Sequence, residues 1–113
     1  MSDDRPVRAW LSDARIYADE ARRIAHSKGE ASLDRRDYLA IRYCLMVVGE
    51  ALDWVPVDIF AREPAIPWRR IIALRHRLVH GYWLIDEDLL TEIARNETER
   101  LISSLDRLIS SVR

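Results

Sequence analysis

Hydrophobic residues recur every three or four positions along most of the chain, which is the period of α-helices that bury one face. Over residues 6–26 the apolar positions follow this period closely, and charged residues occupy the opposite face. A second helix is predicted from about Ser32 or Asp34 to Trp54. Its segment 38–48 is apolar nearly all round, which indicates a central helix that is contacted from several sides.

Prolines and a glycine set the boundaries of the elements that follow. Three prolines divide the next connector, in which residues 57–62 are expected to form a short helical turn. Another helix is predicted to begin at Pro67 and to end near Gly81, because proline favours the first turn and glycine the end of a helix. Asp86 is expected to cap a last helix that continues to the C-terminus.

The last helix carries a row of apolar and small residues with alternating three- and four-residue steps. This spacing suits lengthwise packing on another helix, within the bundle or across a dimer, and comprises Leu90, Ala94, Thr98, Leu101, Leu105, Leu108 and Val112. We find no internal repeat and no convincing strand alternation. The sequence therefore predicts an all-α protein, a four- to five-helix up-down bundle that forms one domain over residues 1–113.

Composition narrows the possible classes of protein. The net charge of −1 gives no overall basic field, so a nucleic-acid site would have to be a local patch. Seventeen of the eighteen basic residues are arginine, which favours bidentate phosphate contacts. The single cysteine, Cys44, lies in an apolar run and is expected to be buried and reduced. No signal peptide is visible, because the N-terminus is acidic and lacks an apolar stretch. No membrane span is visible either, because the longest apolar run is short and is interrupted by Arg42, and we expect a cytoplasmic protein.

The helix that ends near Gly81 contains one charged residue on a line predicted to face the core. Apolar residues at helical spacing mark this line, namely Trp68, Ile72, Val79 and Tyr82, and steps of three and four along it reach Arg75. Burying a guanidinium costs free energy unless a carboxylate or a phosphate pairs with it.

Two interpretations of Arg75 are open from the residues alone. In the structural one, Arg75 forms a buried ion pair with Glu50 of the central helix, and His80 is a helix C-terminal residue favoured by the macrodipole. In the chemical one, Arg75 holds phosphoryl oxygens and His80, with an ordinary pKa of about 6.5, transfers protons near neutral pH. Both can hold at once if Glu50 orients Arg75.

A family resemblance supports the chemical interpretation. The pattern Arg-x4-His-x-Tyr, read at Arg75, His80 and Tyr82, resembles the motif of the HEPN ribonuclease superfamily, and more narrowly that of the HepT toxins. Residues 48–52, Val-Gly-Glu-Ala-Leu, resemble the family's Ile-Gly-Glu-Ala element. Residues 64–68, Pro-Ala-Ile-Pro-Trp, resemble its Pro-x-Ile-Pro-Trp element. These elements occur in the family's order, although His76 stands where this branch usually has asparagine.

The resemblance implies a specific activity and specific partners. It implies a metal-independent endoribonuclease without a cofactor, the toxin of a type VII-like toxin–antitoxin module, in which the RNA 2′-hydroxyl is the nucleophile. It further implies a homodimer with a composite site, and an MntA-type nucleotidyltransferase antitoxin that attaches AMP to Tyr82. Geometry also favours a dimer, because Arg75 and His80 on one helix point about 140° apart unless the helix unwinds at Gly81.

Several neighbouring residues have a functional and a structural interpretation. His76 could accept or relay a proton, but with His80 it lacks a third ligand, so no metal site is expected. Arg69, Arg70 and Arg77 could extend a basic strip for RNA phosphates, or simply form a solvated face. Trp83 could stack on a base, and Tyr82 could merely end the apolar line with its hydroxyl at the rim. The alternative function is a non-catalytic, nucleotide-binding helical partner of a nucleotidyltransferase.

Overall fold

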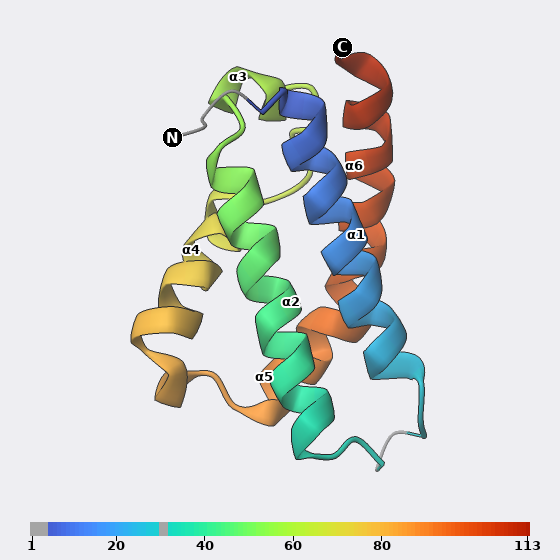
Figure 1. The fold of residues 1–113 in the computed structure, drawn as a ribbon, viewed down its shortest axis with the longest axis vertical. Coiled ribbons are helices and arrows are strands. Elements are labelled where there is room, and N and C mark those ends of the chain that lie inside the picture. Colours follow the sequence, from blue (N-terminus) through green and yellow to red (C-terminus); the bar gives the residue numbers. More distant parts are fainter. Residues whose placement is uncertain (1–4, 30–31) are drawn as a thin grey trace.

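The structure, a computed structural model, describes residues 5–29 and 32–113, and within these ranges it contains helices and no strand. The long helices run alternately down and up, with α2 between α1 and α4 in the view of Figure 1. The elements are α1 (Val7–His26), α2 (Arg35–Asp53), α3 (Val57–Phe60), α4 (Trp68–His80), η1 (Tyr82–Leu84), α5 (Glu87–Glu92), the π-helical η2 (Ile93–Glu97) and α6 (Thr98–Ser111). The predicted all-α up-down bundle is confirmed.

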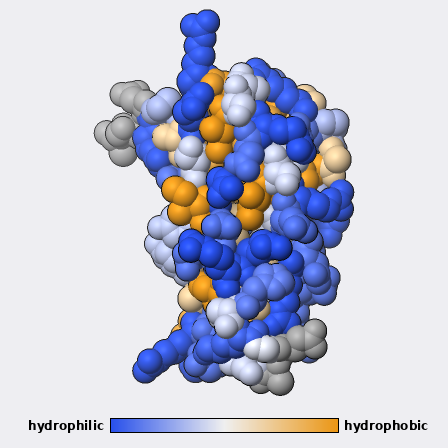
Figure 2. Space-filling view, turned by 90° about the vertical axis from the view of Figure 1, so that its right-hand side faces the viewer, coloured by the Kyte–Doolittle hydropathy of each residue, from blue (hydrophilic) through white to orange (hydrophobic). Residues whose placement is uncertain are grey.

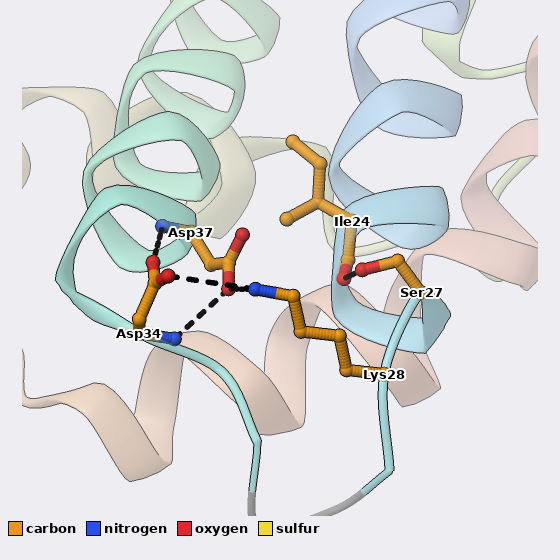
Figure 3. Close-up of polar contacts among 5 residues, drawn as sticks. All are labelled: Ile24, Ser27, Lys28, Asp34 and Asp37. Carbon is orange, nitrogen blue, oxygen red and sulfur yellow. Dashed lines mark hydrogen bonds and ion pairs between the residues drawn. The ribbon is translucent and has the colours of Figure 1, made fainter.

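Polar contacts cap the end of α1 and the start of α2 and join these two helix ends (Figure 3). The Ser27 hydroxyl donates to the Ile24 carbonyl at the end of α1, 2.7 Å away. Asp34 and Asp37 form a reciprocal capping box at the start of α2, which satisfies two backbone N–H groups of its first turn. The Lys28 ammonium lies 2.8 Å from the Asp37 carboxylate and joins the two ends.

Small residues let α1 approach the rest of the bundle closely. Its inward face carries four alanines with no exposed surface, Ala14, Ala18, Ala21 and Ala25. The row of residues predicted for the last helix is buried from Leu90 to Leu108 and packs within the bundle, against α1 among other elements. Of the two arrangements left open by the sequence, the structure therefore has packing within the chain.

The connector between α2 and α4 is held by aromatic stacking. Trp68, at the start of α4, stacks on Phe60 of α3 with ring centroids 4.6 Å apart. The indole N–H of Trp68 donates to the Glu63 carbonyl at 2.8 Å. Ile66 and Trp68 are both 7% exposed, so the Pro-Ala-Ile-Pro-Trp segment fixes where α4 begins.

The side of the molecule formed by α1 and α6 is largely polar. Hydrophilic residues cover most of it and hydrophobic ones are confined to small areas (Figure 2). Ion pairs cross between the two helices, with Arg15 2.7 Å from Asp106 and Arg22 3.4 Å from Glu99. Among the described helices, none is long and apolar enough to cross a membrane.

Candidate active site

Arg75 and Glu50 join α4 to α2 at the centre of the candidate site. Nε of Arg75 lies 2.8 Å from Oε1 of Glu50, which is the distance of an ion pair. The Nε atom itself is buried, but its N–H does not point along the line to the carboxylate, so the contact is mainly electrostatic. The two side chains remain 36% and 46% exposed, so the pair lies at the edge of the protein and not in the core as the structural interpretation supposed.

Gly49 explains how Arg75 comes so close to α2. A Cβ atom on Gly49 would lie 2.5 Å from Cβ of Arg75 and 3.3 Å from the carbonyl oxygen of Ile71. Any side chain at this position would push α4 away from α2. The two neighbouring residues of the segment 48–52 thus have different roles. Gly49 leaves space for Arg75 to pack against α2, and Glu50 forms an ion pair with it.

Glu50 is held in turn by an aromatic pair. The indole N–H of Trp54, one turn further along α2, donates to Oε2 of Glu50 at 3.2 Å. Trp54 stacks on Trp10 of α1 with ring centroids 5.5 Å apart and an interplanar angle of 13°. Glu50 is therefore fixed through one oxygen and pairs with Arg75 through the other.

The apolar line predicted for α4 is wrong at its C-terminal end. Val79 is 39% exposed and Tyr82 is 63% exposed, whereas Leu78 is 8% exposed and packs in the core. Neighbouring helix positions are about 100° apart, and the way α4 lies on α2 turns Leu78 inward in place of Val79. Arg75 lies at the boundary between this buried face and solvent.

His80 and His76 lie on the exposed side of α4. Their rings are 4.6 Å apart between centroids, one helical turn from each other. The helix continues through His80 and ends at Gly81, so no unwinding turns His80 toward the Arg75 of the same chain. The described residues contain no group of three histidine, cysteine or acidic side chains that could hold a metal ion.

Tyr82 lies beyond the end of α4, which ends before Gly81 as predicted, so it does not continue the face of the helix that carries Arg75. It begins the short 3-10 helix η1, and its ring stands edge-on to Trp83 at 5.4 Å. The main chain of this segment is held by Arg42 of α2, whose guanidinium donates to the carbonyls of Tyr82, at 3.3 Å, and of Ile85. This role of Arg42 was not predicted from the sequence, in which the one signal for it was an arginine interrupting an apolar run.

The three arginines predicted to form one basic strip lie on two sides of α4. At about 100° per residue, Arg69 shares a face with His76 and His80. Arg70 and Arg77 face the other flank, where both line a groove toward η2 and α6. Cys44 is buried, as expected, and burial raises the pKa of its thiol to about 11, so it is not a reactive nucleophile at neutral pH.

Fold and motif together define the class: this is a small helical protein of the HEPN ribonuclease type. Residues 14–108 match the family described as "Ribonuclease HepT-like". The chain therefore belongs to the HepT-like ribonuclease family, as the resemblance implied.

Named relatives agree with this family. The chain is 29% identical over 112 residues to "Putative RNase MJ1216" of Methanocaldococcus jannaschii, which covers 96% of this chain and 91% of that protein. It is 33% identical over 104 residues to "Putative RNase MJ1380" of the same organism, a match that covers 86% of this chain and 91% of that protein. It is 28% identical over 75 residues to "Probable ribonuclease HepT" of Thermococcus cleftensis, a match that covers 66% of this chain and 68% of that protein. No solved structure matches the chain.

Proposed function

We propose that this protein is an endoribonuclease that cleaves RNA without a metal ion and acts as a toxin. The observation that carries the proposal is which edge of the Arg75 guanidinium contacts Glu50 and which edge remains free. Glu50 contacts its Nε edge, so the terminal nitrogens of the guanidinium remain available for a phosphate. Family membership and the exposed His80, five residues further along the same helix, support the same function.

The reaction requires a fixed cation and a proton carrier. The RNA 2′-oxygen attacks the adjacent phosphorus while its proton passes to a base, and the bond from phosphorus to the 5′-oxygen breaks as that oxygen gains a proton. The products are a 2′,3′-cyclic phosphate and a 5′-hydroxyl. We assign proton transfer to His80 and stabilisation of the charged phosphoryl oxygens to Arg75, with His76 beside His80 as a proton relay.

We further propose that two copies of the chain share one cleft. Arg75 and His80 point about 140° apart on an unbroken helix. A second copy of the chain is therefore needed to place an arginine and a histidine in the same cleft. Exposed apolar side chains beside the motif support such a contact, namely Leu39, Tyr43, Val79, Trp83 and Leu84. Mixing inactive Arg75→Ala and His80→Ala proteins should restore part of the activity, and full activity of a demonstrated monomer would refute the shared site.

The RNA strand is proposed to follow the exposed side of α4. Arg69 lies on the face of His76 and His80, so it can contact a phosphate next to the one that is cleaved. Exposed Trp83, near the same helix end, is available for stacking on a base.

Control of the enzyme is proposed to act on Tyr82. Its 63% exposure and its place in a turn tethered by Arg42 make the hydroxyl accessible to a partner nucleotidyltransferase of the MntA type. A tyrosyl-AMP adds a phosphodiester with about one negative charge, which would compete for Arg75. Intact-mass analysis after co-expression with such a transferase should find one adenylate on Tyr82 and lost cleavage. An unmodified chain in a silenced complex would mean inhibition by binding alone.

The experiment that tests the proposed activity is end-group analysis of cleaved RNA in the presence of a chelator. The purified chain should cleave RNA in EDTA and leave 2′,3′-cyclic phosphate and 5′-hydroxyl ends. Activity that is lost in EDTA, or products with a 5′-phosphate, would contradict the mechanism. Expression of the active protein should also slow cell growth, and expression of Arg75→Ala should not.

A further inference from the structure

A groove runs along the flank of α4 that faces away from Arg75. It holds about 490 Å³ between α4 and the segment formed by α5, η2 and α6. Along α4 and the residue that precedes it, the lining extends from Pro67 to Arg77, about 15 Å at 1.5 Å per residue. Packed protein interiors have few voids larger than a water molecule, so an opening of this size is a surface feature and not a packing defect.

The helix arrangement explains why the groove exists. α1 packs along both α2 and α6, and α2 packs along α4, whereas α4 and α6 lie largely apart. Apolar side chains from three of these helices line the space between them, including buried Leu45 of α2, half-buried Leu74 of α4 and buried Leu101 of α6. The bundle thus has an open position with an aliphatic floor, into which one more helix could pack.

The edges of the groove are basic. Arg70 and Arg77 line it from α4 and Arg100 lines it from α6, and Glu97 is the acidic residue of the lining. None of the three arginines forms an ion pair with another part of the chain described by the structure. Three arginines elsewhere among the described residues do form ion pairs between helices, namely Arg15, Arg22 and Arg75, with Arg15 2.7 Å from Asp106.

We propose that this groove binds an acidic amphipathic helix from a partner protein of different sequence. Leucine-like side chains of the ligand would fill the aliphatic floor, and carboxylates on both sides would pair with Arg70, Arg77 and Arg100. Apolar burial supplies affinity, and the arginine edges supply orientation and selectivity for acidic partners.

Two other occupants fit the observations less well. RNA binding without base pairing relies on aromatic stacking, and no aromatic side chain is among the residues that line the groove. A second copy of this chain meeting the groove through a two-fold axis would place the same patch against itself, arginine against arginine. The aliphatic floor with unpaired basic edges instead matches a helix with acidic flanks.

The test uses the full chain and two synthetic peptides measured by fluorescence anisotropy. One peptide of about 15 residues carries leucine at helical i, i+3, i+4 and i+7 positions with glutamate flanks, and the other has lysine in place of glutamate. The glutamate peptide should bind at least about tenfold more tightly, because its flanks pair with the arginines while lysines are repelled. Equal binding of the two peptides, or no binding of the glutamate peptide up to about 1 mM, would overturn the proposal.

Charge-reversal variants locate the site. Arg70→Glu and Arg77→Glu should each weaken binding of the glutamate peptide about tenfold, since each replaces an attraction by a repulsion. Arg69→Glu makes the same change on the other side of the same helix and should change binding less than about twofold. Equal weakening by Arg69→Glu would show a nonspecific charge effect and refute the groove.

A third probe, a single-stranded RNA, tests the alternative occupant. RNA binding should be unaffected by Arg70→Glu and Arg77→Glu if the groove is a protein site. Weaker RNA binding by these variants, together with unchanged peptide binding, would assign the groove to RNA and overturn the proposal. Because peptide binding needs no RNA cleavage, the result is independent of the proposed ribonuclease activity.

Discussion

Gly49 and Arg75 occupy adjoining positions on α2 and α4, with room for a hydrogen atom but not for a methyl group between them. A Cβ on Gly49 would lie 2.5 Å from Cβ of Arg75. The close approach of two helices therefore depends on one missing side chain, and it sets where the guanidinium lies relative to Glu50, 2.8 Å away.

Gly49→Ala is expected to destabilise the protein and to impair the site together. The added methyl group overpacks a helix contact, an effect of about 1–3 kcal/mol in protein cores, so the melting temperature should fall measurably. RNA cleavage should fall as well, because Arg75 moves. The matched control is Gly29→Ala, where the nearest atom would be 3.9 Å away, and it should leave both quantities unchanged. Wild-type cleavage by Gly49→Ala would show that the close contact does not position Arg75.

Glu50→Gln should reduce cleavage more than it reduces stability. The amide retains an oxygen for the Trp54 indole but loses the charge that orients Arg75, and misplacing such a group by an ångström costs about a hundredfold in rate. A partly exposed ion pair contributes at most about 1 kcal/mol, so thermal melting should change little. Asp53→Asn, a nearby change of an exposed α2 carboxylate, is the control for both assays. Unaltered cleavage by Glu50→Gln would show that the charge of Glu50 does not position Arg75 for catalysis.

Arg42→Ala should loosen the segment that carries Tyr82. The carbonyls of Tyr82 and Ile85 lose the Arg42 guanidinium as a donor, and Tyr82 keeps only its bond from the Ile85 N–H, which should cost about 1–3 kcal/mol locally. Hydrogen exchange measured by mass spectrometry should rise over residues 81–86 and stay constant in α1. The control is Arg36→Ala, which removes an exposed arginine from the same helix. It should leave hydrogen exchange unchanged both over residues 81–86 and in α1. Unchanged exchange over residues 81–86 in Arg42→Ala would contradict the assigned role.

The contact between Glu63 and Arg107 predicts how the stability of the protein changes with pH. The hydrogen bond from the Arg107 guanidinium, at 2.8 Å, holds the pKa of the Glu63 carboxyl below its ordinary value. A lowered folded-state pKa adds stability above the unfolded-state value of about 4.3, and this stability is lost as the pH falls through the folded-state pKa. Wild type should therefore melt above Glu63→Gln at pH 7, and the gap should narrow below about pH 4.

The control for this pH effect is Glu92→Gln. Glu92 is exposed and makes no ion pair within the described part of the chain, so its substitution should produce no gap that depends on pH. A gap between wild type and Glu63→Gln that stays constant from pH 7 to pH 3 would refute the coupling.

Helix positions were predictable from the sequence because their signals are local. The period of apolar residues, the Asp34 and Asp86 caps and the glycine after His80 all act within a few residues of one another. The Arg75–Glu50 pair was also predictable, since both charges interrupt apolar surfaces and need partners.

Features that depend on how helices cross were not predictable in this way. Leu78 and Val79 are adjacent and similarly apolar, so only the position of α2 decides which one is buried. The Arg42 contacts join residues 40 or more positions apart, and the groove beside α4 results from the separation of α4 and α6. Each depends on packing between segments that local periodicity does not describe.

The central claim, that Arg75 and His80 carry out RNA cleavage, is tested most directly by the initial cleavage rate of single variants in EDTA. Arg75→Ala and His80→Ala should each lose at least about a hundredfold in rate, the scale of a lost charge-stabilising or proton-transferring group. Their melting should stay close to that of wild type, and Arg36→Ala should cleave normally. Cleavage near the wild-type rate by either variant would contradict the account.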